Sequence, residues 1–453
     1  MSRASRAKAE TALEACDAVL AQSPGDAVAR HNRAVELRRL GRSVEALIEI
    51  ELAHKAGSRA PKTALMYAHL LADAGRYDEA VDGYRTLIAH DPRAIDAHET
   101  LARLLPQIGR GAEALDSYRQ ALAMDPGWGA LWLSALGTAK DLRDGQQLLD
   151  WGQAVETRFG PDTLVTTLRA QALSWRGDDL AALAVLESGI AADPQHQPLH
   201  STLAHVALRL GDPEMAKASA LRAAQLAPTD QTSWALLSVA LRLLDDPREH
   251  WLTDYAAHVL EVDLEGVDLA ATAACLTALH TTQHQPAEQS LRNGTQTRGD
   301  VFDRSDAEIV ALELAIENAI STALRRVTPD PKHPFARRNT GTTQFVGAWS
   351  VRLRESGFHI DHIHPSGWLS SACYIALPPE IDGTGDAGAL QFGVPDAALG
   401  LDLPPRRVVR PRAGKLVLFP SYFWHGTVPF ESQQPRLTVA FDALPVDNMP
   451  LRG

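Results

Sequence analysis

The sequence predicts two unlike parts in one chain of 453 residues: an all-α N-terminal part and a β-rich C-terminal part. Three observations predict this division. Up to about residue 260 the chain is rich in Ala and Leu, and Pro and Gly recur there at a constant step. After about residue 340, short strand-like runs stand between Gly and Pro. A chain of this length also exceeds one ordinary domain, so we expect a multidomain α plus β protein.

Composition and charge narrow the classes of function. Hydrophobic residues make up 45% of the chain and the formal net charge is −12, which repels phosphate backbones, so we expect no nucleic-acid partner. No apolar run approaches the length of about 18 residues that spans a bilayer, so we expect no membrane contact. The polar start of the chain does not read as a signal peptide, and Cys16, Cys275 and Cys373 lie far apart. We therefore expect a cytoplasmic protein with reduced thiols.

Prolines and glycines mark a repeat in the N-terminal part. The sequence numbers of successive marker prolines differ by 68, 34, 35, 33 and 34, and those of the glycines by 34, 34, 68 and 34, where 68 is twice 34. A period of about 34 residues is that of a helix–turn–helix unit. The markers are Pro24, Pro92, Pro126, Pro161, Pro194 and Pro228, with Gly41, Gly75, Gly109, Gly177 and Gly211.

One unit shows how the repeat is built. Its first helix ends at Gly109, where a left-handed backbone is needed. Its second helix carries Ala114, Tyr118 and Ala121 at spacings of four and three, which places them on one face. Pro126 closes the unit, because proline cannot continue a helix. These residues resemble the tetratricopeptide-repeat (TPR) family, and the resemblance covers roughly half the chain.

The resemblance implies a TPR α-solenoid with capping helices over residues 1–262. About seven units fit before about residue 245. The unit from Trp128 to Phe159 is degenerate and lacks its turn glycine in register. Stacked repeats form a concave surface suited to an extended peptide, so we expect a protein or peptide partner there. Residues 263–334 are expected to form a connector and a helix that packs on the C-terminal domain, residues 335–453.

Metal-ligand residues gather in the C-terminal part. Residues 358–368 read FHIDHIHPSGW, with three His and one Asp within six positions. His425 follows a predicted buried strand about 60 positions later, and Arg436 lies eleven positions further on. Non-haem Fe(II) oxygenases use three protein ligands on one face of the metal, and two of them can share a strand face at a spacing of two. Arg436 and Thr438 share a strand face and suit a carboxylate.

These segments resemble the 2-oxoglutarate/Fe(II) oxygenase superfamily, closest to its bacterial TPR-linked branch. The resemblance rests on FHIDHIHPSGWLSSACYIALP and on PRAGKLVLFPSYFWHGTVPF with PRLTVAFD. It implies a double-stranded β-helix (jelly-roll) domain that uses Fe(II), 2-oxoglutarate and O2. It also implies that His425 is a metal ligand and that Arg436 and Thr438 bind 2-oxoglutarate.

Two pairs have the spacing for the first two ligands: His359 with Asp361, and His362 with His364. Strand alternation places the pairs on opposite faces, so only one pair binds the metal. His359 and Asp361 match the superfamily's usual ligand types. His362 and His364 stand immediately before Pro365, which suits a strand end. We favour His362, His364 and His425, a set without the usual carboxylate, and keep the other pair as an alternative.

Three functions follow from this pattern. The first is a 2-oxoglutarate-dependent dioxygenase that hydroxylates a protein or peptide side chain recruited by the TPR array. The second is a TPR protein-binding scaffold whose oxygenase-like domain is inactive, which the absent carboxylate motivates. The third is a cupin-like metalloenzyme that does not use 2-oxoglutarate, against which Arg436 argues.

Overall fold

A computed structural model of the chain describes residues 3–58, 60–281, 290–381 and 385–446. Residues 282–289 of the predicted connector and 447–453 of the predicted C-terminal domain lie outside the described residues. Helices fill the chain up to His258, and two antiparallel sheets follow with further helices between their strands. Within the described ranges, every helix is too short or too polar to cross a bilayer.

A helical solenoid forms the N-terminal half and confirms the predicted repeat. Its alternate helices begin at residues 27, 61, 95, 129, 163, 197 and 231, so each begins one repeat period after the one before. The helices are α1 (Arg3–Gln22), α2 (Ala27–Arg39), α3 (Ser43–Lys55), α4 (Pro61–Asp73), α5 (Tyr77–His90), α6 (Ile95–Gln107), α7 (Asp116–Met124), α8 (Gly129–Asp141), α9 (Gly145–Phe159), α10 (Thr163–Trp175), α11 (Asp179–Ala192), α12 (Gln197–Arg209), α13 (Pro213–Leu226) and α14 (Gln231–Leu243).

The turn between the two helices of a unit requires a left-handed backbone. All five marker glycines adopt it, with φ between 72° at Gly41 and 86° at Gly177. In the degenerate unit the equivalent residue, one period after Gly109, is Arg143, which adopts φ 54°. Asp245, one period after Gly211, also stands where the other units have glycine, and it adopts φ 50°. The turn geometry therefore persists where the glycine is lost, at a cost in backbone strain.

The sheets hold the C-terminal part together. The larger has six strands in the order β1-β7-β4-β9-β3-β2, and the smaller has three in the order β6-β5-β8. Two of these strands, β1 and β2, precede residue 335, where we predicted the β-rich domain to begin. The strands are β1 (Leu260–Asp263), β2 (Leu291–Gln296), β3 (Thr343–His359), β4 (Leu369–Ala376), β5 (Leu390–Phe392), β6 (Arg407–Val409), β7 (Lys415–Pro420), β8 (His425–Thr427) and β9 (Arg436–Pro445).

Further helices cover this part of the chain. The long helix α18 buries Ile309, Leu312 and Ile316 in the core that it shares with the sheet. The helices that follow the solenoid are α15 (Arg248–Leu252), α16 (Tyr255–His258), α17 (Leu269–Ala278) and α18 (Ala307–Leu324). The 3-10 turns among the described residues are η1 (Gly111–Glu113), η2 (Val301–Asp303), η3 (Ala336–Arg338) and η4 (Ala397–Leu399).

The last repeats and the sheets share one hydrophobic core. Buried residues from Ala204 in α12 to Leu241 in α14 belong to the same cluster as those of β4, β7 and β9. The indole nitrogen of Trp424 donates to the carbonyl oxygen of Ala235, 3.0 Å away. The guanidinium of Arg242 donates to the carbonyl of Gly393 at 2.7 Å. This end of the solenoid is therefore part of the C-terminal domain's core and not a tethered neighbour.

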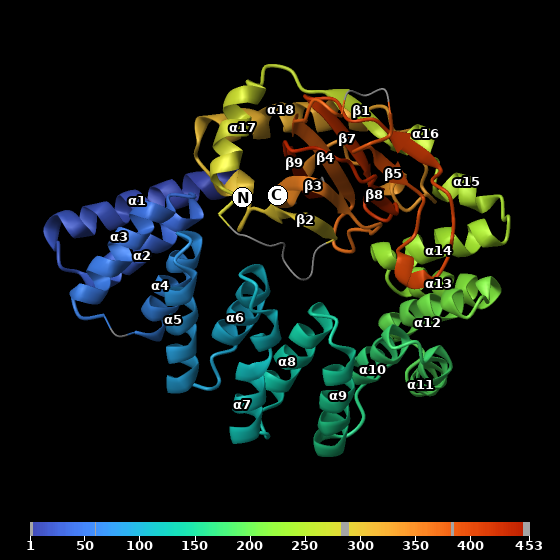
Figure 1. The fold of residues 1–453 in the computed structure, drawn as a ribbon, viewed down its shortest axis with the longest axis horizontal. Coiled ribbons are helices and arrows are strands. Elements are labelled where there is room, and N and C mark those ends of the chain that lie inside the picture. The colour runs from blue at the N-terminus through green and yellow to red at the C-terminus, as the bar shows by residue number, and fades with distance from the viewer. Residues whose placement is uncertain (1–2, 59, 282–289, 382–384, 447–453) are drawn as a thin grey trace, which may run out of the picture.

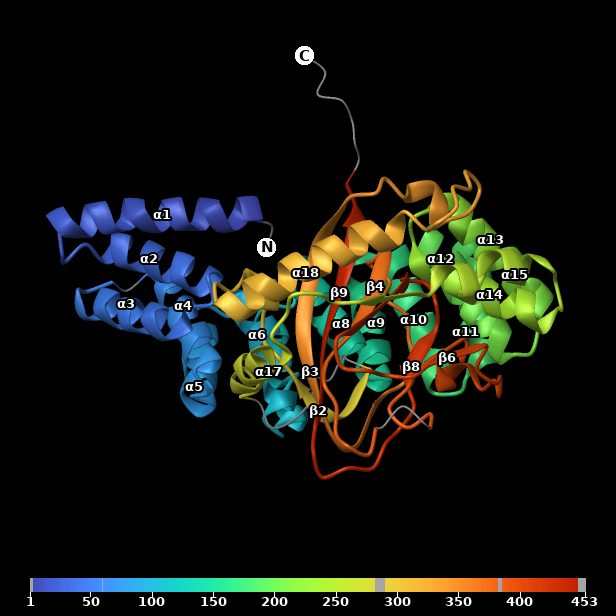
Figure 2. The ribbon, with the colours of Figure 1, turned by 90° about the horizontal axis from the view of Figure 1, so that it is seen from above.

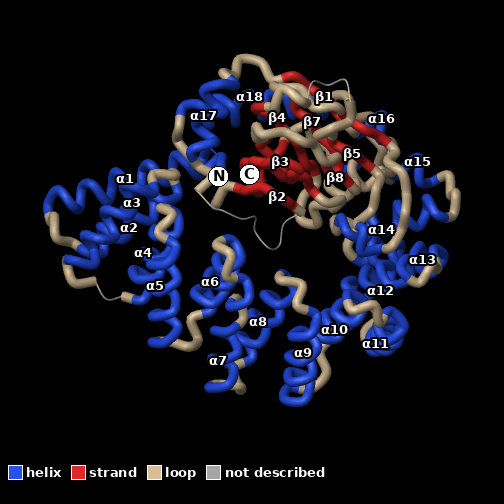
Figure 3. The backbone as a smooth tube through the Cα atoms, in the orientation of Figure 1, coloured by secondary structure: helices blue, strands red, loops and turns tan. Residues whose placement is uncertain are grey.

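The first helix also reaches the C-terminal part. Arg6 in α1 pairs with Glu313 in α18 at 2.8 Å, and both side chains are buried. Figure 1 shows the solenoid curving around the sheets, with α1–α5 on one side and α12–α14 on the other. Figure 2 shows the same arc from above, and Figure 3 shows the sheets enclosed by helices. The inner side of the solenoid therefore faces the sheets.

Candidate metal centre and its pocket

Main-chain hydrogen bonds bring the three predicted histidines together. β3 ends at His359, and the chain continues beside β8. The backbone N–H of His362 donates to the carbonyl of His425 at 2.9 Å, and the N–H of His425 donates to the carbonyl of His362 at 3.0 Å. Two residues on, the N–H of His364 donates to the carbonyl of Ser421 at 3.0 Å. Backbone pairing, and not side-chain packing alone, fixes the spacing of the cluster.

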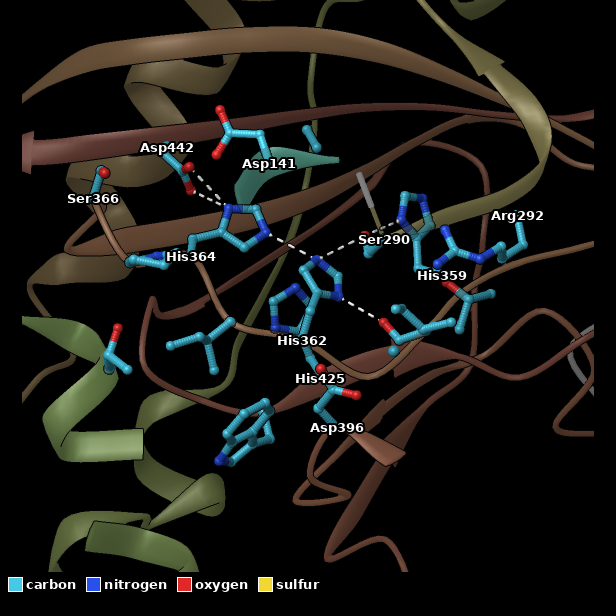
Figure 4. A pocket seen from close by; sticks show the side chains of 18 of the residues that line it. Asp141, Ser290, Arg292, His359, His362, His364, Ser366, Asp396, His425 and Asp442 are labelled. Carbon is cyan, nitrogen blue, oxygen red and sulfur yellow. Dashed lines mark hydrogen bonds and ion pairs between the residues drawn. The ribbon is translucent and has the colours of Figure 1, made fainter. Parts of the chain in front are cut away.

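The three imidazoles converge. One ring nitrogen from each of His362, His364 and His425 lies within 4.8 Å of those of the other two. The ring centroids of His362 and His425 are 4.2 Å apart, and that of His364 lies 5.1 Å from each of them. Figure 4 shows the rings pointing toward a common point in the pocket. A single cation placed there would meet three nitrogen ligands from one side, which leaves its other positions open.

Hydrogen bonding fixes the same tautomer in all three rings. The Nδ1 atom of His362 faces the carbonyl of Ile360 at 2.7 Å, and that of His425 faces the carbonyl of Phe423 at 2.9 Å. The Nδ1 atom of His364 faces a carboxylate. Because these oxygens accept hydrogen bonds, each Nδ1 carries the proton and each Nε2 carries a lone pair, which in His362 also lies 3.1 Å from the Ser290 hydroxyl. Three Nε2 lone pairs are thus available to a metal.

The spacing of two of these lone pairs fits a metal ion. The Nε2 atoms of His362 and His364 lie 3.2 Å apart. With both protons on Nδ1, neither can donate to the other, so the contact is repulsive unless a cation lies between them. Two nitrogens bound at about 2.1 Å and at right angles lie about 3 Å apart. The residues therefore fit a divalent metal.

Burial keeps two of the three histidines, His362 and His425, neutral. It lowers the pKa of His362 to about 3 and the pKa of His425 well below its ordinary value. The neighbouring histidines lower both pKa values further. The neutral imidazole is the form that binds metal ions. His362 and His425 can accordingly bind a metal at neutral pH without releasing protons.

The alternative pair lies elsewhere in the site. His359 and Asp361 are not in the metal-capable group found among the described residues. The Nδ1 of His359 hydrogen-bonds with Ser290 Oγ at 2.8 Å, and its ring stacks on His362 with centroids 5.8 Å apart. Our expectation of opposite faces was wrong for His359, which lines the same pocket, because regular alternation stops where β3 ends. Asp361 accepts from Gln391 at 2.9 Å, and burial raises the pKa of its carboxyl to about 6.

A carboxylate that sequence reasoning missed supports the cluster. Asp442 on β9 places its two oxygens 2.7 and 2.8 Å from the Nδ1 of His364. Ser370 donates to the same carboxylate at 2.6 Å. Asp442 lies six positions after Arg436, and an even spacing on a strand puts both side chains on one face. That spacing is the signal that identifies Asp442 from sequence.

Arg436 and Thr438 line the same pocket as the histidines. The Arg436 side chain is buried, and its guanidinium carbon lies 5.0 Å from the ring centroid of Tyr374. Within the described part of the chain, the Nε of Arg436 has no hydrogen-bond partner, whereas the Tyr374 hydroxyl interacts with the same guanidinium. A buried donor without a partner is costly, so Arg436 is arranged for a ligand that satisfies it. A carboxylate has the matching charge and acceptors.

The cavity around these groups has a volume of about 810 Å³. The sheets supply one wall, with the histidines and Arg436. The inner faces of solenoid helices supply the other, with residues from α8, α10, α12 and α14. Sequence reasoning did not place solenoid side chains at the metal site, because it treated the repeats as a separate domain.

Comparisons with known families agree with this division of the chain. Residues 347–442 match the family model described as "Putative 2OG-Fe(II) oxygenase", and residues 198–230 match a tetratricopeptide repeat. The first match lies in the β-rich part of the chain and the second in its last repeats. The oxygenase match includes all three clustered histidines together with Arg436 and Asp442. It begins inside β3 and therefore leaves out β1 and β2.

Two solved structures resemble the helical half. One is a tetratricopeptide repeat protein from Parabacteroides merdae ATCC 43184, with 17% identity, a TM-score of 0.35, and coverage of 52% of this chain and 94% of that one. The other is the APC/C hetero-tetramer Cut9-Hcn1, with 17% identity, a TM-score of 0.31, and coverage of 51% and 46%. No curated protein matches the chain.

Proposed function

We propose that this protein is an Fe(II)- and 2-oxoglutarate-dependent dioxygenase that hydroxylates a protein or peptide side chain recruited by its solenoid. One observation carries the proposal: three converging histidine nitrogens and a buried, incompletely satisfied guanidinium line one pocket. The histidine nitrogens suit a metal, and the guanidinium suits one carboxylate of a dicarboxylate. The family match over residues 347–442 supports the same reading. We also propose that the enzyme acts in the cytoplasm.

In this proposal His362, His364 and His425 hold the iron through Nε2, and the double-stranded β-helix formed by the two sheets positions them. When bound, Fe(II) with 2-oxoglutarate and O2 supplies the oxidation that converts 2-oxoglutarate to succinate and CO2 and places oxygen on a C–H bond. The backbone pairing of His362 with His425 keeps the ligand nitrogens in place. Because the ligands are already in position, the site does not have to rearrange when the metal binds.

Asp442 supplies the negative charge that a set of three imidazoles lacks. Its carboxylate hydrogen-bonds the Nδ1–H of His364, and Ser370 holds the carboxylate in turn. A carboxylate behind a ligating histidine fixes the ring orientation and raises the basicity of the ligating nitrogen. The charge thus acts through His364 and not by direct coordination.

Arg436 orients 2-oxoglutarate by binding its distal carboxylate. The guanidinium presents donors in a planar fork, which matches a carboxylate better than a point charge does. The Tyr374 ring and hydroxyl lie against the guanidinium, and Thr438 lines the pocket beside it. The burial of Arg436 strengthens this charge interaction, because water does not screen it.

Succinate formation tests the proposal. Full-length protein with Fe(II), ascorbate, 2-oxoglutarate and a broad peptide pool should form succinate. Metal-free protein and His425→Ala should not. An absence of succinate from wild-type protein that carries a full equivalent of iron would contradict the proposal. Wild-type protein that binds no iron would instead favour the scaffold without activity.

A further inference from the structure

The degenerate turn places an arginine where other units have glycine. Arg143 adopts the left-handed backbone at φ 54°, one period after Gly109, which adopts φ 80°. A residue with a Cβ is strained in that conformation, whereas glycine is not. Strained residues persist where the surrounding structure holds them, and they gather at functional sites. The contacts of the Arg143 side chain therefore decide whether the strain serves a function.

The Arg143 side chain reaches across the pocket. Its guanidinium lies 3.5 Å from the carboxylate of Asp396, and both residues line the cavity. Its guanidinium carbon lies 5.9 Å from the ring centroid of Trp175, which lines the same cavity from α10. Arg143 belongs to the turn between α8 and α9, in the solenoid, and Asp396 lies between β5 and η4, in the sheet part. The ion pair thus joins the two walls of the pocket.

The exposure of this ion pair places it at the edge of the cavity. The side chain of Arg143 is 61% exposed and that of Asp396 is 22% exposed, although both line the cavity. By contrast, His425 and Arg436 line the same cavity and are buried. The pair therefore stands where the cavity meets solvent, at a mouth through which a ligand can reach the histidines.

The segment that carries Asp396 is fixed at both ends. Arg242 in α14 donates to the carbonyls of Gly393 and Pro404, each at 2.7 Å. Because α14 shares its core with the sheets, this anchor does not depend on the ion pair. Arg143 is instead a long and mostly exposed side chain, which can change rotamer rapidly. Opening of the mouth thus requires movement of Arg143 alone.

The strength of the ion pair suits a contact that opens repeatedly. An exposed ion pair shifts an equilibrium by only about two- to fivefold. Such a bias is too weak to hold the solenoid on the sheets, and the shared hydrophobic core already does so. It is strong enough to keep a mouth closed for most of the time. The magnitude therefore favours a gate over a structural clamp.

We propose that Arg143 and Asp396 form a gate across the mouth of the pocket, which is closed when their charges pair and open when the Arg143 side chain moves away. The gate sets how fast ligands enter and leave and does not bind them. The inference rests on the proposed function only for the choice of 2-oxoglutarate as a probe.

Stopped-flow binding of 2-oxoglutarate to full-length, Co(II)-loaded protein tests the gate. Arg143→Gln keeps a long side chain without the charge, and Asp396→Asn keeps an oxygen that caps η4. Each should raise the association and dissociation rate constants about two- to fivefold and leave the dissociation constant unchanged. The double variant should be no faster than either single variant, because each change removes the same pair.

The directions of change separate a gate from other roles. Attraction or repulsion of the anionic ligand alone would slow association in Arg143→Gln and speed it in Asp396→Asn, and this opposite response overturns the inference. A fall in affinity with an unchanged association rate constant also overturns it, because that result marks a binding residue. Equal rate constants in wild-type protein and both variants overturn it as well.

A matched pair of glycine variants separates the gate from the turn. Arg143→Gly and Asp245→Gly each restore the usual turn residue of the repeat, at positions with φ 54° and φ 50°. Asp245 is not among the residues that line the pocket. Circular dichroism checks that both variants are folded, and only Arg143→Gly should speed exchange of 2-oxoglutarate. The same exchange rate in both glycine variants would leave Arg143 as a turn residue only and overturn the gate.

Removal of bound Co(II) by a bulky aromatic chelator tests the mouth if wild-type protein binds no 2-oxoglutarate. Faster removal from Arg143→Gln and Asp396→Asn than from wild-type protein would then support the gate and overturn the proposed function. Equal removal rates would overturn the gate as well. Wild-type protein that takes up no Co(II) overturns both.

Discussion

The Nδ1 atom of His364 lies between the two carboxylate oxygens of Asp442, at 2.7 and 2.8 Å. This contact places a negative charge one ring away from the proposed iron. A three-histidine site without a carboxylate ligand therefore still has a carboxylate in its immediate surroundings. The sequence shows only that a carboxylate is missing from the favoured ligand set.

Replacing Asp442 with Asn should weaken metal binding. Asparagine keeps an oxygen that accepts from His364 but removes the charge, so the affinity for Fe(II) or Co(II) should fall about 10- to 100-fold. Titration with either ion measures the change. Asp386→Asn removes an exposed carboxylate that pairs with Arg410, and it should leave the affinity unchanged. Equal affinities in wild-type and Asp442→Asn protein would show that the carboxylate has no influence on the metal.

Arg436 should control 2-oxoglutarate binding. Lysine keeps the charge but loses the planar fork, so Arg436→Lys should weaken 2-oxoglutarate binding more than tenfold, or by about 1.4 kcal/mol or more. Tyr374→Phe removes the hydroxyl that interacts with this guanidinium and should have a smaller effect in the same direction. Calorimetry on metal-loaded protein measures both. Unchanged affinity in Arg436→Lys would remove Arg436 from the site.

The bond between Trp424 and Ala235 should stabilise the whole molecule. Trp424→Phe removes one of the donors to the Ala235 carbonyl, which Ser238 Oγ also reaches at 2.7 Å, and the loss of this buried hydrogen bond should lower the free energy of unfolding by about 1 kcal/mol. Trp251 supplies a control, because its indole donates to Asp330 in an exposed place. Trp251→Phe should cost less than about 0.5 kcal/mol. Urea unfolding compares the two, and equal losses would contradict a shared core.

Two glycines should respond to alanine in opposite directions. Neither Gly177 nor Gly137 has an atom within 4 Å of an added Cβ, so sterics against neighbours are absent at both. Gly177 ends α10 at φ 86°, and Gly177→Ala should lower the free energy of unfolding by about 1 kcal/mol. Gly137 lies inside α8, where Gly137→Ala should raise it by about 0.5–1 kcal/mol. Thermal unfolding of both variants checks the signs, and a stabilised Gly177→Ala would contradict the turn assignment.

The solenoid was predictable because its determinants are local. A constant repeat period and a glycine at each turn specify helix pairs without reference to distant residues. Even the degenerate unit follows the rule, since Arg143 adopts the backbone that glycine adopts elsewhere. The shared core was not predictable in this way. Ala235 and Trp424 are 189 residues apart, and nothing local to either indicates the other.

The site was predictable in part. Residue type and spacing indicated His362, His364 and His425, and the structure brings them together. Alternation failed at His359, because the argument assumed that β3 continues past its actual end. The solenoid wall was missed because a repeat pattern indicates which residues face inward but not what they face.

Metal binding by four variants tests the central claim most directly. Wild-type protein should bind one equivalent of Fe(II) or Co(II), and His425→Ala and His364→Ala should lose it. His359→Ala and Asp361→Asn should retain it, because their side chains lie outside the converging group. The account is contradicted if Asp361→Asn abolishes binding while His364→Ala preserves it.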